Sequence, residues 1–193
     1  EVVDLEQPVR ALGEFGGMLY AVAYNQLWQV SRLGAATPVA NIPDSPRVTM
    51  AGNGDTILVT TGDTVTAYNP VTGAVNGVTG LPNASSVDYI DNFAIFTEPN
   101  SGRIWVSDVG DLDTVNGLSF ATAETDEDEV VRVFVDHREI WVFGKDTVEV
   151  WYVSGGADLP IARANEATLE KGCASPMIVQ KVSGTVFWIG NDR

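Results

Sequence analysis

Three carboxylates lie close together in one short stretch of the sequence, at Asp108, Asp111 and Asp113. Oxygen atoms are the ligands that Ca²⁺ prefers, so these aspartates are the first candidates for metal chemistry in the chain. Their spacing does not follow the Asp-x-[Asp/Asn]-x-[Asp/Asn]-Gly pattern of a calcium-binding loop. We therefore interpret the stretch as a polar turn and keep the three aspartates as weak calcium candidates.

The chain contains one histidine, His137, and one cysteine, Cys173. His137 follows Asp136 in a predicted hairpin turn, and adjacent side chains of a strand point apart, so we do not expect them to act as an acid–base pair. A single cysteine forms no intrachain disulfide, and we expect Cys173 to be a buried small hydrophobic residue. The sequence also lacks nucleophile-elbow, zinc-protease and phosphate-loop motifs. We expect no catalytic residue, no cofactor and no enzyme activity.

The charge balance is strongly acidic, with 26 Asp and Glu residues against 11 Lys and Arg residues and a net charge of −15. Surfaces that grip nucleic acid are basic because they must neutralise phosphates, so we expect no tight DNA binding. A like-charge run covers Glu124–Glu129. Such runs are usually solvated or disordered loops, and the alternative is a surface for a basic partner.

The stretch from Glu129 to Pro160 predicts three consecutive strands, at 130–135, 140–143 and 147–153. β-Branched and aromatic residues fill the strands, and turn-forming residues separate them. Residues 140–143 are apolar at every position, which indicates a strand that is buried on both faces. Sheets that stack face to face, as propeller blades do, cover both faces. We expect Trp141 and Trp151 to be buried between adjacent sheets.

The three-strand pattern recurs along the chain. Its central strands align at Leu19, Ile57, Ala94, Ile140 and Val186, with steps of 38, 37, 46 and 46 residues. Propeller repeats of about 40–50 residues fall in this range. The predicted fold is therefore all-β and β-propeller-like, with about four to five hairpin or blade units at 11–46, 47–85, 86–129, 130–175 and 176–193.

Smaller features complete the prediction. Residues 32–46 read as a loop, and the only helical turn is expected at 165–171. The sequence contains no run of about 18 apolar residues, so we expect no membrane-spanning helix. The fifth unit has no third strand after 185–189, and an open strand edge is unfavourable. We therefore expect the chain to be part of a longer protein.

Several segments together resemble a known family. They are IWVFG at 140–144, TVEVWY at 147–152 and SGGA at 154–157, preceded by LY at 19–20, LW at 27–28, RVTMA at 47–51 and IWVSD at 104–108, and followed by KGC at 171–173. Their order and spacing resemble the packaged-DNA stabilisation proteins of short-tailed phages, also called tail accessory factors or tail hub proteins.

The resemblance implies a virion protein of the phage tail, present in the host cytoplasm during assembly. It implies a homo-oligomeric ring, six-fold in the family, below the portal and its adaptor and above the tail needle. There the ring helps to close the portal channel after packaging and opens at ejection. The resemblance brings no catalytic, cofactor or metal residues with it.

Two other classes of function stay open at this stage. A carbohydrate- or protein-binding propeller domain would suit the fold, with exposed aromatic residues on one rim. A calcium-dependent propeller hydrolase would depend on Asp108, Asp111 and Asp113.

Overall fold

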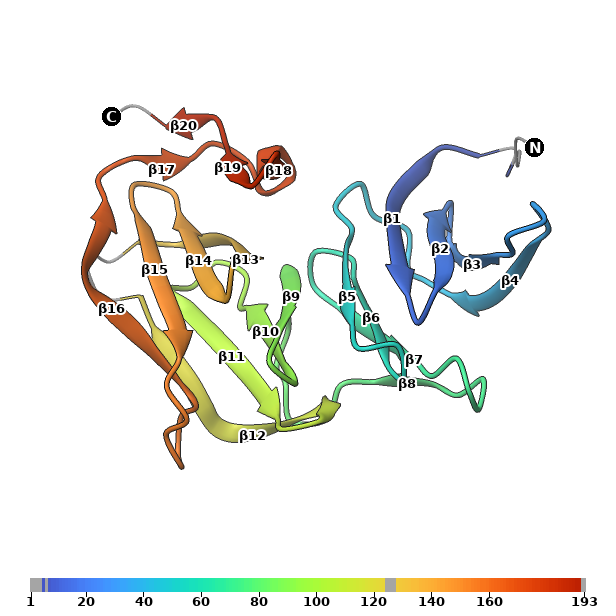
Figure 1. Ribbon diagram of the computed structural model, residues 1–193, viewed down its shortest axis with the longest axis horizontal. Coiled ribbons are helices and arrows are strands. Elements are labelled where there is room, and N and C mark those ends of the chain that lie inside the picture. Colours follow the sequence, from blue (N-terminus) through green and yellow to red (C-terminus); the bar gives the residue numbers. More distant parts are fainter. Residues whose placement is uncertain (1–4, 6, 124–127, 192–193) are drawn as a thin grey trace.

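The computed structural model describes residue 5, residues 7–123 and residues 128–191, and nearly all of the regular structure in them is β-strand. Four antiparallel sheets of four strands follow one another along the chain, each with its strands in sequence order (Figure 1). The first sheet contains β1 (Val9–Phe15), β2 (Met18–Ala23), β3 (Gln26–Val30) and β4 (Ala36–Asn41). The second sheet contains β5 (Thr49–Gly52), β6 (Ile57–Thr60), β7 (Val65–Tyr68) and β8 (Val75–Gly77).

The second half of the chain continues the pattern. The third sheet contains β9 (Ser86–Ile90), β10 (Phe93–Thr97), β11 (Arg103–Asp108) and β12 (Asp111–Thr122). The fourth sheet contains β13 (Val130–Asp136), β14 (Glu139–Gly144), β15 (Val148–Val153) and β16 (Ile161–Leu169). A C-terminal segment follows with β17 (Gly172–Cys173), the 3₁₀ turn η1 (Pro176–Ile178), β18 (Gln180–Val182), β19 (Thr185–Phe187) and β20 (Gly190–Asn191). In this segment β17 pairs with β20, and β18 pairs with β19.

Two tight turns have the backbone conformation that joins antiparallel strands. Asp91 and Asn92 between β9 and β10 have φ values of 45° and 72°, and His137 and Arg138 between β13 and β14 have values of 48° and 65°. Positive φ at both central residues is the mark of a type I′ turn, whose twist matches that of the strands it connects. Asn and Asp tolerate this conformation better than most residues.

Each sheet has a fourth strand that the sequence did not reveal. The segment predicted as a loop at 32–46 contains β4, and the helical turn predicted at 165–171 is wrong because β16 covers most of it. β16 pairs with the edge of β15, with Trp151 opposite Arg163 and Val153 opposite Ile161. An outermost strand needs only an existing edge with free N–H and C=O groups, so a weak apolar pattern is enough.

The sheets are arranged around an arc, with their first strands on the inside (Figure 1). β1 packs beside β5, β5 beside β9, and β9 beside β13. The later strands of each sheet lie progressively further out. This is the radial arrangement of propeller blades, and the predicted all-β, β-propeller-like fold class is confirmed.

Apolar layers fill the spaces between successive sheets. Tyr20 and Val22 of the first sheet pack with Ile57 and Val59 of the second. Comparable clusters join the second sheet to the third, the third to the fourth, and the fourth to the C-terminal segment. The fourth sheet contributes alternate residues of β14 to both of its neighbours, which confirms the two-sided burial expected for residues 140–143.

The two tryptophans of the fourth sheet behave differently. Trp151 is buried in the layer against the third sheet, as expected. Trp141 is half-buried on the opposite face, where its ring lies 6.3 Å from that of Trp188 in the C-terminal segment.

Among the described residues, no helix is long and apolar enough to cross a membrane.

Replacement of Trp151 by alanine should destabilise the protein by about 3–5 kcal/mol, because it empties an aromatic core site between two sheets. The matched control is Val71→Ala, since Val71 is exposed in a turn of the second sheet and its truncation should change the unfolding free energy by less than about 0.5 kcal/mol. Urea denaturation followed by tryptophan fluorescence measures both values. Equal midpoints for the two variants would contradict the buried position of Trp151.

Candidate interaction surfaces

Polar side chains link the innermost strands of successive sheets. The hydroxyl groups of Thr49 and Thr60, at the paired ends of β5 and β6, lie 2.6 Å apart. The Thr49 Oγ1 atom also accepts a 3.0 Å hydrogen bond from the backbone N–H of Val87 in the third sheet. A buried N–H at the inner edge of β9 is thereby satisfied by a side chain of the preceding sheet.

The same device recurs one sheet later. Ser86 and Thr97 form a hydroxyl pair at 2.8 Å, and Ser86 Oγ accepts a 3.1 Å hydrogen bond from the N–H of Val133 in the fourth sheet. These links were missed at the sequence level. The sequence signal for these links is a repeated pattern: the first strand of the unit begins with Ser or Thr, and its second strand ends with Thr. This pattern occurs in two consecutive units.

Asp88 provides a further link between the third and fourth sheets. Its Oδ2 atom accepts a 2.7 Å hydrogen bond from the N–H of Val135. Burial raises the pKa of Asp88 to about 6, against the lowering effects of the hydrogen bonds from Val135 and Tyr89 and of the nearby charge of Arg132. The ionised carboxylate is therefore costly in this place.

Arg132 occupies the same inner region from the fourth sheet. Its Nη1 donates a 2.6 Å hydrogen bond to the carbonyl oxygen of Pro176, and its guanidinium lies 5.4 Å from the ring centre of Phe134. Burial lowers the pKa of Arg132, while the charge of Asp88 opposes that shift. The side chain thus ties the C-terminal segment to the fourth sheet.

Asp128, from the acidic run, is a buried anchor and not part of a solvated loop. Its Oδ1 accepts a hydrogen bond from the N–H of Lys145, and its Oδ2 accepts hydrogen bonds from the N–H groups of Asp146 and Thr147 and from the Thr147 hydroxyl, all between 2.9 and 3.1 Å. These groups form the turn between β14 and β15, so a carboxylate is needed to satisfy them. The sequence prediction for the run is wrong at this residue, and residues 124–127 lie outside the described part of the chain.

Glu149 is a second buried carboxylate that sequence analysis missed. It is 1% exposed, accepts a 2.9 Å hydrogen bond from the indole N–H of Trp151 and pairs with Arg163 at 3.2 Å. Trp151 is two residues further along the same strand, so the two side chains lie on one face. Glu149 therefore contributes to the packing of the fourth sheet and is not a free acid.

A polar hollow with a volume of about 680 Å³ lies at one end of the sheets. It is lined by the segments that lead into β5, β9 and β13, by the turns between the second and third strands of these sheets, and by the C-terminal segment. Its lining includes Arg47, Asp63, Ser85, Asn100 and Lys145. Three sheets thus contribute equivalent positions to one concave, mixed-charge surface.

The three calcium candidates lie at the other end of the third sheet. Asp108 ends β11 and stands opposite Asp111 at the start of β12, and a side-chain hydrogen bond with Asp111 raises the pKa of Asp113. Within the described residues, no group of three or more His, Cys, Asp or Glu side chains is placed to hold a metal ion. The calcium role of these aspartates stays a prediction.

Asp136 and His137 do meet, contrary to the sequence expectation, because the positive φ of His137 turns its ring back. Its Nδ1 lies 2.7 Å from Asp136 Oδ2. Lys181 of β18 contacts the other carboxylate oxygen, and this contact is the main reason that the pKa of Asp136 is lowered. The cluster joins the fourth sheet to the C-terminal segment.

Cys173 is buried as expected, and burial raises the pKa of its thiol.

The profile of a protein family described as "Bacteriophage P22 Gp10, beta-propeller" matches residues 8–193. The chain belongs to this family. The Gp10 family comprises packaged-DNA stabilisation proteins, so the chain is assigned to a family of structural proteins of the bacteriophage virion. The predicted resemblance is confirmed. A search of curated proteins gives no match.

Solved structures support the fold of this Gp10-family chain. Two crystal structures of an extracellular domain from B. thetaiotaomicron, assigned to a one-component and to a hybrid two-component system, match with TM-scores of 0.62 and 0.60. The identities are 16% and 15%, and the matches cover 92% and 95% of this chain. They cover 25% and 27% of the solved chains, so this chain spans about a quarter of their length. At these identities the likeness shows the fold alone.

The Asp88→Asn variant should have a flatter dependence of stability on pH than the wild type. In the folded state the pKa of Asp88 is about 6, whereas the ordinary pKa of an aspartate is 3.8. Between these two pH values the folded state holds a proton that the unfolded state has lost. The unfolding free energy of the wild type should therefore fall by up to roughly 3 kcal/mol as the pH rises from 3.8 to 6. Asparagine keeps an acceptor for the N–H of Val135 and has no charge to desolvate.

Urea unfolding between about pH 3.5 and pH 7 measures this difference in pH dependence. The control is Asp55→Asn, since Asp55 is exposed in the turn between β5 and β6 and should leave the slope unchanged. Parallel curves for the wild type and Asp88→Asn would show that this carboxyl does not titrate between the sheets.

Removal of the Asp128 carboxylate should cost at least about 2 kcal/mol, because Asp128→Ala leaves several donors of the β14–β15 turn without acceptors. Glu129→Ala is the matched neighbour: it removes an exposed pair with Lys145, at 2.6 Å, and should cost less than about 1 kcal/mol. Thermal unfolding of the two variants compares these costs directly. A larger loss for Glu129→Ala than for Asp128→Ala would refute the anchoring role.

Proposed function

We propose that this protein is a tail hub component that stabilises packaged DNA by closing the portal channel and that joins the portal and adaptor to the tail needle. The observation that carries the proposal is its membership of the Gp10 family over residues 8–193. In this proposal the protein forms a homo-oligomeric ring, six-fold as the sequence resemblance implies, which assembles in the host cytoplasm and becomes part of the virion tail.

The packing of the sheets supports a mechanical role. Each space between sheets is filled with apolar side chains, and hydrogen bonds from Val87, Val133 and Val135 connect one inner strand to the next. A stack that is joined both by its layers and at its inner edge resists bending. A plug that withstands the pressure of packaged DNA requires such a rigid body.

The charge supports a conduit that does not hold DNA. A net charge of −15 gives no counterion release on contact with phosphates, which is the main driving force of non-specific DNA binding. Repulsion acts within a Debye length, about 8–10 Å at physiological salt. DNA therefore slides past such a wall at ejection.

The polar hollow favours a second candidate function, a protein- or carbohydrate-binding propeller domain. It has a volume of about 680 Å³ and both charged and uncharged polar groups, which is a suitable size and chemistry for a peptide or sugar. Asp63→Arg would change the charge of the hollow, whereas Asp55→Arg changes the same sheet at the opposite end of β6. If a peptide or sugar binds to the wild type and to Asp55→Arg but not to Asp63→Arg, this second function is supported.

The tail-hub proposal is tested by sedimentation of the protein with the portal–adaptor complex of the phage that encodes it. We expect co-sedimentation in a stoichiometry that equals the adaptor's or is a simple fraction of it, because ring interfaces must close by rotation. The adaptor-free portal is the control. Failure to bind the adaptor complex, together with tight binding of a sugar by the hollow, would replace the first function by the second.

A gel shift with double-stranded DNA at about 150 mM salt tests the conduit. We expect no retardation at micromolar protein concentrations, since the charge leaves no electrostatic driving force. Tight DNA binding under these conditions would contradict the proposed passage of DNA along the protein.

A further inference from the structure

Two charged side chains in the polar hollow have no ion-pair partner. Arg47 and Asp63 both line the hollow and are exposed, and in the described part of the chain neither of them forms an ion pair. The other charged residues of the lining, Glu129 and Lys145, pair with each other at 2.6 Å. The hollow therefore presents one free positive charge and one free negative charge.

Both free charges come from the same end of the second sheet. Thr49 of β5 is the cross-strand partner of Thr60 of β6. Arg47 lies two residues before Thr49, and Asp63 lies three residues after Thr60, so both extend beyond the same end of the paired strands. A ligand that meets one of these charges therefore meets the other as well.

The hollow continues from this end past the third and fourth sheets to the C-terminal segment. The third sheet contributes the exposed side-chain amide of Asn100, which can donate and accept hydrogen bonds at the same time. An amide of this kind matches the N–H and C=O groups of a peptide main chain. The volume of about 680 Å³ accommodates several residues of an extended chain.

The lining also distinguishes a peptide from a sugar. None of the described residues that line the hollow is aromatic. Proteins bind sugars largely by stacking the apolar face of the sugar ring on an aromatic side chain, so the main element of a carbohydrate site is missing from this lining. The composition therefore favours a peptide ligand.

The walls of the hollow are held in place by the protein itself. The Ser45 hydroxyl accepts a 3.1 Å hydrogen bond from the N–H of Arg47 and donates a 3.2 Å one to its carbonyl oxygen. Arg10 donates a hydrogen bond to the carbonyl oxygen of Ser45, and Asp128 accepts one from the N–H of Lys145 in the fourth sheet. A ligand that enters a preformed site loses less affinity to the ordering of the protein.

We propose that the hollow binds an extended segment of a partner protein, with a basic side chain of the segment against Asp63, an acidic side chain against Arg47 and the main chain along Asn100. This inference rests on protein binding by the hollow, the second candidate function above, and names the ligand. A segment without both charges leaves Arg47 or Asp63 unpaired, so the site selects by sequence as well as by shape.

A titration of the isotope-labelled protein with short peptides, followed by amide chemical shifts, tests the proposal. The probes are end-capped peptides in which one lysine and one glutamate are separated by one to three glycines, in both orders. Matched peptides carry two lysines, two glutamates or two serines, and maltotriose represents a sugar. We expect saturable shifts at Gly62 and Asn100 with the lysine–glutamate peptides and binding at least about fivefold weaker with every other probe.

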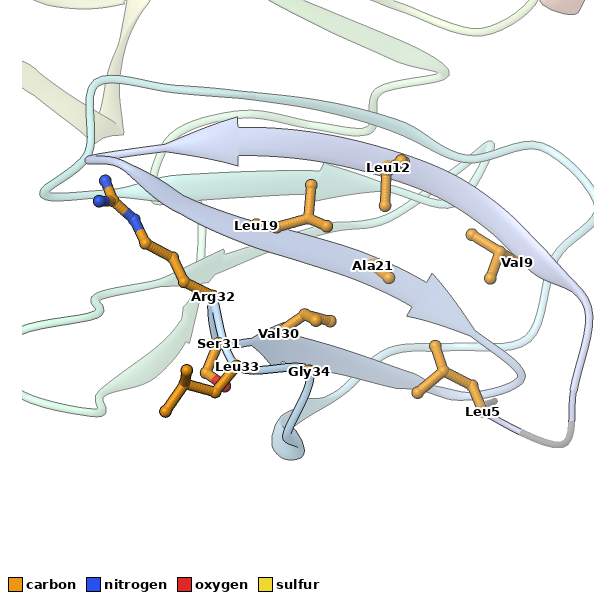
Figure 2. A pocket seen from close by; sticks show the side chains of 10 residues that line it. All are labelled: Leu5, Val9, Leu12, Leu19, Ala21, Val30, Ser31, Arg32, Leu33 and Gly34. Carbon is orange, nitrogen blue, oxygen red and sulfur yellow. The ribbon is translucent and has the colours of Figure 1, made fainter. Parts of the chain in front are cut away.

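Charge reversal in the hollow provides the second readout. Asp63→Arg and Arg47→Glu should each weaken binding of the lysine–glutamate peptides at least about fivefold, because an attraction is replaced by a repulsion. The double variant should bind these peptides again, since it presents one charge of each sign. The controls make the same changes outside the hollow: Asp55→Arg between β5 and β6, and Arg32→Glu after β3, beside a separate groove of the first sheet (Figure 2).

The outcomes that overturn the inference fall into two groups. If the two-serine peptide binds as well as the lysine–glutamate peptides, or if the double variant does not regain binding, the hollow binds proteins but Arg47 and Asp63 do not select the ligand. If maltotriose alone binds, or if no peptide binds, protein binding by the hollow is itself contradicted.

Discussion

Apolar side chains on both faces of each sheet are the constraint on which the rest of this structure depends. A sheet such as the fourth, with Ile140 and Val142 on one side and Phe143 on the other, cannot leave either face in water without exposing core residues. Full burial of one such side chain contributes about 1.5–3 kcal/mol, so each additional layer of neighbours stabilises the stack substantially. The sheets must therefore stack, and because their first strands lie together on the inside, the stack curves into an arc.

Apolar layers alone would allow the sheets to slide, since hydrophobic packing is not directional. The hydroxyl pairs at Thr49 and Ser86 fix the register, because each accepts one particular backbone N–H of the next inner strand. Buried polar groups of this kind must be satisfied, so a shift of one sheet would leave both a donor and an acceptor unpaired. In the function proposed above, this combination is what a plug under load requires: a body that keeps its shape, with an acidic surface that does not hold DNA.

The sequence was sufficient to predict the stacked sheets, because continuous apolar runs such as 140–143 and the hairpin turn at His137 carry strong local signals. The outermost strands were not predictable in the same way: β8 is exposed throughout and β16 depends on the edge that β15 offers. The buried carboxylates Asp128 and Glu149 were also missed. Nothing in the acidic run distinguishes Asp128 from its neighbours, since its role comes from a turn of 145–147 that only tertiary packing brings near it.

The central claim is that the inner strands are bonded from sheet to sheet, so that the arc behaves as one rigid body. Native-state hydrogen exchange of the Val87 and Val133 amides tests this most directly, because each N–H donates its hydrogen bond to a side-chain oxygen of the preceding sheet. We predict that both amides exchange as slowly as that of Ile95 in the centre of the third sheet. Exchange as fast as that of the exposed turn residue Val71 would contradict the account.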